Sequence, residues 1–176
     1  AVLQPNFRGS GGYGEKFVEL GYGQIGRAMQ DDLDDAMDWA VAEGIADKDR
    51  VCLVGASYGG YASLWGVLRN PERYRCAASF AGGTDWDLIL KHDDRFFMNW
   101  ASQKHEEKIV GEENFDLDTV SPYRLAESLS RPVLIAQGKD DTIVPWSQHT
   151  KFRSAVKKSS ITPVELVFED EGHGFD

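Results

Sequence analysis

A single serine stands among small residues in the segment GASYG, residues 55–59. The apolar run VCLV precedes it and a helical pattern follows at once, so the serine is expected at a sharp turn between a strand and a helix. Gly-x-Ser-x-Gly at such a turn is the pattern of a nucleophile elbow, which exposes the hydroxyl to a carbonyl carbon. The helix that follows favours the negative charge that then develops. The chemistry predicted for Ser57 is nucleophilic attack on a carbonyl group; the alternative is a glycine-rich turn with a capping serine.

A serine hydroxyl is a weak nucleophile unless a base takes its proton, so a histidine and an acid are expected downstream of Ser57. His173 follows the apolar run 164–168 and falls in the loop beyond a strand end, which is where the base belongs. The acid is expected after the preceding strand, where QGKDDTIVP contains Asp140 and Asp141. Its role is to orient the imidazole and to stabilise the imidazolium. Spacing alone leaves the choice between the two aspartates open.

Short apolar runs that alternate with helical patterns must position these residues. The runs lack polar alternation, which is typical of a parallel sheet with helices on both faces. In such a sheet ligands bind at the carboxyl ends of the strands, where the serine, the aspartates and His173 all fall. Strands are expected at 1–5, 51–55, 76–80, 132–136 and 163–168, and helices at 26–43, 58–69 and from Pro145 to about 158.

The composition fits one folded domain and excludes two classes of function. The chain has 176 residues, of which 41% are hydrophobic, and a formal net charge of −10. That charge argues against binding to nucleic acid or an anionic membrane, both of which attract basic surfaces. No segment approaches the roughly 20 apolar residues of a membrane span, and residues 1–8 lack the pattern of a signal peptide. The two cysteines, Cys52 and Cys76, are expected to be buried free thiols rather than a disulfide.

The stretch 84–120 breaks the alternation of strands and helices. It is long, charged and aromatic, and is expected to be a helical insertion over the site at one edge of the sheet. Its aromatic residues either line an apolar pocket for substrate or belong to the core. The candidates for substrate binding are Tyr58, Trp86, Phe96, Phe97 and Trp100.

A rival motif, GYGQIG at residues 21–26, matches the G-x-G-x-x-G pattern of dinucleotide-binding proteins. The preceding KFVEL is a poor buried strand because it carries two charges. The next strand ends at Ser57 rather than at the acid that would bind a ribose hydroxyl. The aspartates of residues 31–38 are interpreted as a solvated helix face rather than a metal site. We therefore expect no nucleotide, no other cofactor and no metal.

Four segments together resemble the catalytic domain of the prolyl oligopeptidase family, most of all its acylaminoacyl- and dipeptidyl-peptidase branches. The resemblance covers nearly the whole chain and implies an α/β-hydrolase fold with serine peptidase activity on short peptides. It also implies one domain over residues 1–176 that is truncated at both ends relative to the family. The segments are LQPNFRGSGGYG (3–14), DDLDDAMDWAVAEGIADKDRVCLVGASYGGY (31–61), SPYRLAESLSRPVLIAQGKDDTIVPWSQ (121–148) and VFEDEGHGF (167–175).

The resemblance also implies roles for individual residues. The family pattern G-x-x-D-x-x-V-P aligns with GKDDTIVP, so it assigns the acid to Asp141 rather than Asp140. His173 matches the family base, and the backbone amide of Tyr58 matches one oxyanion donor. Gln137 departs from the family, which usually has histidine before the glycine of this pattern.

Two parts of the family are not in this chain: an upstream loop that completes the oxyanion hole and an N-terminal β-propeller. By resemblance, residues 1–5 and 51–55 are strands that flank a further strand encoded upstream. Without that strand the sheet has bare edges, so we expect self-association or complementation by the rest of the domain. The chain opens inside an expected strand, so the missing signal peptide does not identify the compartment.

Two other functions remain alternatives to a serine peptidase. A carboxylesterase would use the same three side chains on the same scaffold. A catalytically incompetent fragment or interaction module would keep these residues without turnover. An activated serine reacts with a fluorophosphonate and a structural serine does not, so labelling separates the enzymes from the third alternative.

Overall fold

The computed structural model describes residues 1–97, 108, 110, 111 and 115–174. Its centre is a parallel sheet in which four strands lie in sequence order, β1-β2-β3-β4. The predicted buried strands at 51–55, 76–80, 132–136 and 163–168 are confirmed to within two residues at each end. The strands are β1 (Cys52–Ala56), β2 (Cys76–Phe80), β3 (Val133–Gly138) and β4 (Val164–Phe168).

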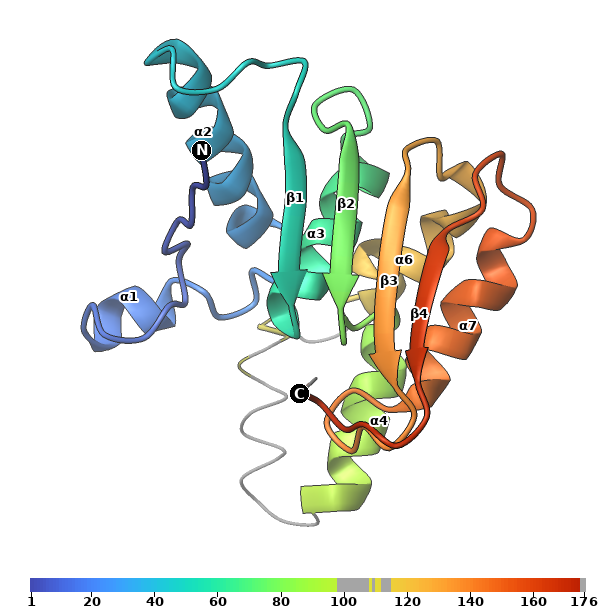
Figure 1. Ribbon diagram of the computed structural model, residues 1–176. Coiled ribbons are helices and arrows are strands. Elements are labelled where there is room, and N and C mark those ends of the chain that lie inside the picture. The colour runs from blue at the N-terminus through green and yellow to red at the C-terminus, as the bar shows by residue number, and fades with distance from the viewer. Residues whose placement is uncertain (98–107, 109, 112–114, 175–176) are drawn as a thin grey trace.

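Helices connect the strands and pack on one side of the sheet. Figure 1 shows α3, α6 and α7 behind the strands, with α2 beside β1. The predicted helices at 26–43, 58–69 and after Pro145 are confirmed. The helices are α1 (Glu15–Glu19), α2 (Ala28–Ala42), α3 (Tyr58–Arg69), α4 (Trp86–Phe97), α6 (Pro122–Leu125) and α7 (Trp146–Val156), with 3-10 turns η1 (Leu117–Val120) and η2 (Ala126–Ser128).

The main core lies between the sheet and these helices. Alternate residues of the central strands, Ala77 of β2 with Val133 and Ile135 of β3, are buried there. They pack with apolar side chains of α3 and α7, because successive strand residues point to opposite faces. The helical partners in this core include Leu64, Val67, Leu68, Phe152 and Val156.

The opposite face of the sheet is apolar and open. Glu165 in β4 bonds His149 of α7 on the helix side, so Val164 and Leu166 face the other way and are exposed. In β1, Val54 is 71% exposed. No described helix covers this face in Figure 1, so the predicted helices on both faces are found on one face only.

Residues 1–5 do not form the strand that the sequence predicts, and that expectation is wrong for this chain. Val2 is exposed, and within the described residues no strand pairs with the segment. A β-strand needs a partner for its backbone N–H and C=O groups, and an apolar run alone does not supply one. The outer edge of β1 therefore remains unpaired in the described part of the chain.

The two cysteines form a disulfide, which corrects the expectation of free thiols. Cys52 and Cys76 begin β1 and β2 and are direct partners in the parallel register, with their Cα atoms 4.7 Å apart. The sequence shows two cysteines in separate apolar runs, but only the register of the sheet brings them together. The disulfide closes the β1-α3-β2 unit at the end of the strands opposite to Ser57.

The stretch 84–120 contains α4 and η1 in its described part. Trp86, Ile89 and Leu90 of α4 pack in a second core with Tyr61 and Trp65 of α3. Figure 1 shows α4 beyond the carboxyl ends of the strands, and the helical insertion over residues 84–120 stays a prediction. Residues 98–107, 109 and 112–114 lie outside the described part.

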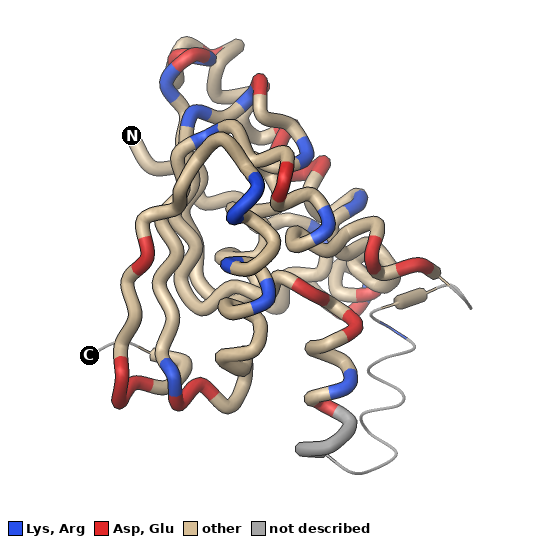
Figure 2. The backbone as a smooth tube through the Cα atoms, turned by 90° about the vertical axis from the view of Figure 1, so that its right-hand side faces the viewer, with Lys and Arg blue, Asp and Glu red and all other residues tan. Residues whose placement is uncertain are grey.

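Charged residues are interspersed over the surface, and acidic residues stand in the turns near the C-terminus (Figure 2). Three aspartates of α2 pair with arginines: Asp32 with Arg8, Asp31 with Arg69 and Asp38 with Arg73. The interpretation of this acidic run as a solvated helix face fits Asp31 and Asp38. It is wrong for Asp34, which is buried and accepts hydrogen bonds from the Tyr74 hydroxyl and the Asn70 amide. In the described ranges, no helix has the length and apolar character needed to cross a bilayer.

Reduction of the disulfide is expected to lower the free energy of unfolding by about 3 kcal/mol, the loop-closure value for a short loop. The bonded cysteines are 24 residues apart in sequence. Urea unfolding of the oxidised protein, the dithiothreitol-treated protein and the Cys52→Ser/Cys76→Ser variant measures the difference. Two reactive thiols in the denatured, unreduced protein would contradict the prediction.

The isolated 176-residue chain is expected to self-associate through the open sheet, because bare apolar edges recruit other strands. Light scattering after size exclusion should show a mass above that of the 19.6 kDa monomer. Val54→Lys should reduce association, because it places a charge on β1. The control Ile45→Lys alters a side chain that is 54% exposed but lies off the sheet, and should change nothing. A monodisperse unsubstituted monomer would refute this expectation.

Candidate active site

Ser57 occupies a strained turn between β1 and α3. Its φ of 55° and ψ of −122° lie in a region that non-glycine residues rarely adopt. Its N–H donates to the carbonyl oxygen of Phe80 at 2.9 Å, which ties the turn to the end of β2. A Cβ on Gly55 would lie 2.4 Å from the carbonyl carbon of Gly59, so only glycine fits at position 55. A Cβ on Gly59 would meet nothing within 4 Å, so the close approach constrains the first glycine of the motif alone.

His173 bridges Ser57 and Asp141. Its Nε2 lies 2.9 Å from Ser57 Oγ, and its Nδ1 lies 2.8 Å from Asp141 Oδ2. Because Nδ1–H donates to the carboxylate, Nε2 is left to accept the serine proton. The predicted convergence of the three side chains at the carboxyl edge of the sheet is confirmed. Asp140 is exposed, and the structure places Asp141 against the imidazole.

The Asp141 side chain is 0% exposed, and four donors surround its two oxygens. Oδ1 accepts the backbone N–H groups of Ile143 and Val144, at 2.9 and 2.8 Å. Oδ2 accepts Gln137 Nε2 at 2.9 Å in addition to His173 Nδ1. A buried carboxylate remains ionised only when such donors replace water. The acid is therefore fixed in position where it meets the imidazole.

Two loops that carry the acid and the histidine are bound to each other. The acid loop is residues 139–145, after β3, and the histidine loop is residues 169–174, after β4. Lys139 N–H donates to Phe168 O at 2.9 Å, and Asp140 N–H donates to Glu171 O at 3.0 Å. A Cβ on Gly138 would lie 2.2 Å from Glu171 O, so the loops pass this closely only because position 138 is glycine. This contact sets the spacing between Asp141 and His173.

Tyr58 contributes a backbone amide and a side chain next to the serine. It is the first residue of α3, so its N–H has no acceptor within the helix. Its ring is 6.2 Å from the ring of Trp86. Burial raises the pKa of its hydroxyl, which stays neutral.

A pocket of about 390 Å³ lies beside Tyr58. Trp86 and Ile89 of α4 form one wall, and Ile25 and Met29 form another. The walls are mainly apolar, and Asp93 and Lys108 add one charge of each sign. The pocket therefore has space for an apolar group beside Tyr58, the residue that follows Ser57. The remaining lining residues are Gly9, Val18, Gly21 and Tyr22.

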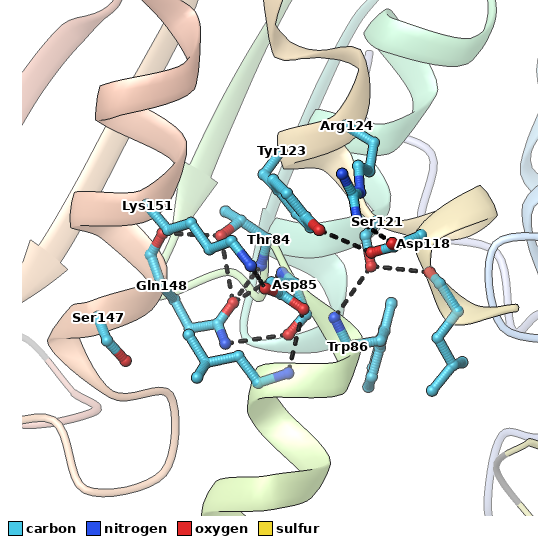
Figure 3. A network of polar contacts seen from close by, with 12 residues as sticks. Thr84, Asp85, Trp86, Asp118, Ser121, Tyr123, Arg124, Ser147, Gln148 and Lys151 are labelled. Atoms are coloured by element: carbon cyan, nitrogen blue, oxygen red, sulfur yellow. Dashed lines mark hydrogen bonds and ion pairs between the residues drawn. The ribbon is translucent and has the colours of Figure 1, made fainter.

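A buried polar network fixes the start of α4 against α7. In Figure 3 the amide of Gln148 faces the backbone of Thr84 and Asp85. Gln148 Oε1 accepts both N–H groups at 2.8 Å, and its Nε2 donates to Asp85 O at 3.0 Å. Lys151 of α7 pairs with the buried Asp85 carboxylate. Trp86 follows Asp85 directly, so this network fixes one wall of the pocket. A separate contact joins α4 to the acid loop: His92 Nε2 donates to Thr142 O at 2.8 Å.

The structure places some of the predicted substrate-binding residues in the pocket, and others lie outside its described part. Tyr58 and Trp86 line the pocket. The side chains of Phe96 and Phe97, at the end of α4, and the whole of Trp100 lie outside the described residues. Sequence reasoning missed the walls supplied by Ile25 and Met29, because only the fold brings them beside α4. It also missed Gln148. The sequence signal for this residue is a polar side chain on the face of the helix that is expected to be buried.

The glycines of the rival motif at 21–26 serve packing. The segment KFVEL before them lies largely in helix α1, where a dinucleotide site requires a strand. Gly26 has φ +64°, and a Cβ there would lie 2.3 Å from the Tyr61 hydroxyl. In the part of the chain that the structure describes, no three His, Cys, Asp or Glu side chains gather to hold a metal ion.

Comparisons with known proteins agree with this geometry. A model of the prolyl oligopeptidase family matches residues 1–176. Dipeptidyl aminopeptidase BIII of Pseudoxanthomonas mexicana is 34% identical over 180 residues, covering 99% of this chain and 26% of that protein. Dipeptidyl peptidase family member 6 of Caenorhabditis elegans is 33% identical, covering 99% and 24%.

A solved structure agrees as well. The puromycin-hydrolyzing peptidase of Mycobacterium tuberculosis superposes with a TM-score of 0.85 at 29% identity, over 97% of this chain and 25% of that one. This likeness confirms the predicted α/β-hydrolase fold. The chain spans about a quarter of the length of each of these relatives.

Substitution of the two neighbouring aspartates separates a role in orienting His173 from a general effect on the acid loop. Asp141→Asn should slow the reaction of Ser57 with a fluorophosphonate by roughly 10³–10⁴-fold, because an amide favours the wrong imidazole tautomer. Asp140→Asn should leave the rate unchanged, because that side chain is exposed to water. The time course of labelling, followed by intact mass, gives both rates. A harmless Asp141→Asn together with a damaging Asp140→Asn would reverse the assignment.

Proposed function

Because the chain belongs to the prolyl oligopeptidase family, we propose that it forms the nucleophile-bearing part of a serine peptidase that hydrolyses short peptides. Ser57 is the nucleophile, His173 the general base and acid, and Asp141 the residue that orients the histidine. The observation that carries the proposal is the continuous contact from Ser57 Oγ through His173 to Asp141, with successive distances of 2.9 and 2.8 Å.

Acylation begins when Ser57 Oγ attacks the scissile carbonyl carbon and His173 Nε2 takes the hydroxyl proton. Asp141 stabilises the imidazolium that results. The amide of Tyr58, supported by the dipole of α3, binds the oxyanion of the tetrahedral intermediate. His173 then returns the proton to the leaving amine as the peptide C–N bond breaks, and the acyl group remains on Ser57.

Deacylation repeats the same steps with water as the nucleophile. His173 Nε2 removes a proton from the water, which attacks the acyl carbon. The tetrahedral intermediate collapses, Ser57 Oγ leaves with the proton from His173, and the product acid departs. Every proton passes through Nε2, so the tautomer that the Asp141 contact selects is required in both halves of the cycle.

The apolar pocket supports a substrate with an apolar side chain beside the scissile bond. Trp86 and Ile89 offer a surface that an aliphatic or aromatic group would cover. Relatives that carry the names dipeptidyl aminopeptidase and dipeptidyl peptidase support short peptides as the substrate class. The same pocket would accept the acyl group of an ester, so a carboxylesterase is the second candidate.

Fluorophosphonate labelling and turnover of the intact protein that contains this chain test the proposal. One adduct is expected, on Ser57, and Ser57→Ala should abolish both the label and hydrolysis, a loss of roughly 10⁴–10⁶-fold in rate. The variant should fold normally, because the substitution removes one hydroxyl. Ser128→Ala, on a distant exposed turn, is the matched control and should keep full activity.

The choice of substrate decides between the two enzymes. A peptidase should hydrolyse free-amino or N-acyl peptide anilides as well as p-nitrophenyl esters. Turnover confined to the esters would favour the carboxylesterase. An intact protein that neither labels nor turns over would be a non-catalytic interaction module, and the proposal would be wrong.

A further inference from the structure

Gln137 is a buried polar side chain directly beneath the acid loop. It is the second-last residue of β3 and is 1% exposed. Its Nε2 donates to Asp141 Oδ2 and to the carbonyl oxygen of Val144, both at 2.9 Å. The side chain therefore joins the acid to the residue that ends its turn. A polar residue in an otherwise apolar strand is costly to bury unless such bonds form.

We propose that Gln137 is a positioning residue, which fixes the Asp141 carboxylate so that it can orient His173. The inference rests on the proposed function, since it assigns a role within the same catalytic group. Among the hydrogen bonds of the described residues, Gln137 binds neither Ser57 nor His173, so it acts on the histidine through Asp141.

Geometry requires a second anchor on the acid. The two backbone amides of Ile143 and Val144 hold Oδ1. If His173 were the sole donor to Oδ2, the acid and the base would each depend on the other for orientation. Gln137 removes that dependence, because it binds Oδ2 from the rigid strand β3. The plane of the carboxylate is then set before the imidazole docks on it.

The rate of fluorophosphonate labelling of the intact protein, measured from pH 5 to 9, tests this proposal without knowledge of the natural substrate. Gln137→Met keeps the length of the side chain and removes the donor. It should lower the plateau rate by about 10- to 100-fold, the range for loss of a hydrogen bond to a charged group.

The matched control is Gln30→Met. Gln30 is also 1% exposed but lies on α2, away from the acid loop. Its substitution should change the thermal midpoint at most and leave the plateau rate as in the parent protein. Gln137→Glu, which keeps shape and volume, decides the question if the methionine variant fails to fold. It replaces the amide donor by an acidic oxygen and should likewise lower the plateau rate.

The outcomes separate this inference from the proposed function. A parental rate and profile in a folded Gln137 variant, with labelling still dependent on Ser57, overturns the positioning role alone. Equal losses of plateau rate in Gln137→Met and Gln30→Met also overturn it, because they reflect stability only. Labelling that survives Ser57→Ala overturns both.

Discussion

The buried carboxylate of Asp141 is the group on which the rest of the site depends. It has no exposure to water, so its charge is stable only while the protein supplies donors to both oxygens. Two donors come from its own loop, one from β3 and one from the histidine loop. The fold at this edge of the sheet therefore brings these donors together around the carboxylate. The fixed carboxylate in turn orients the imidazole of His173.

The parallel sheet supplies that convergence. Its strands are all parallel, so the segments after β1, β3 and β4 emerge at the same edge. Two close backbone approaches then set the spacing of Ser57, Asp141 and His173. They are the turn at Gly55 and the contact between Gly138 and Glu171. Neither approach tolerates a side chain, which explains why glycine stands at both positions. The hydrogen bonds of Gln148 hold the start of α4 against α7, and α4 forms one wall of the pocket.

Local patterns in the sequence predicted the four strands of the sheet, the long helices and the convergence of three side chains, because apolar periodicity and the chain order of the motifs determine them. The strand at 1–5 was wrong, since a strand depends on a partner that the segment itself does not encode. The disulfide was missed because Cys52 and Cys76 meet only through the register of β1 and β2. The pocket walls at Ile25 and Met29 and the contact of Gln137 likewise depend on packing between distant segments.

The central claim is that Ser57 is a nucleophile served by the amide of Tyr58 and by His173, with the pocket beside it for the substrate. A crystal structure of the fluorophosphonate-treated protein tests this most directly. The account predicts phosphorus bonded to Ser57 Oγ, a phosphoryl oxygen within hydrogen-bond distance of Tyr58 N, and the alkyl substituent against Trp86. An unmodified Ser57, or an adduct whose phosphoryl oxygen points away from the start of α3, would contradict it.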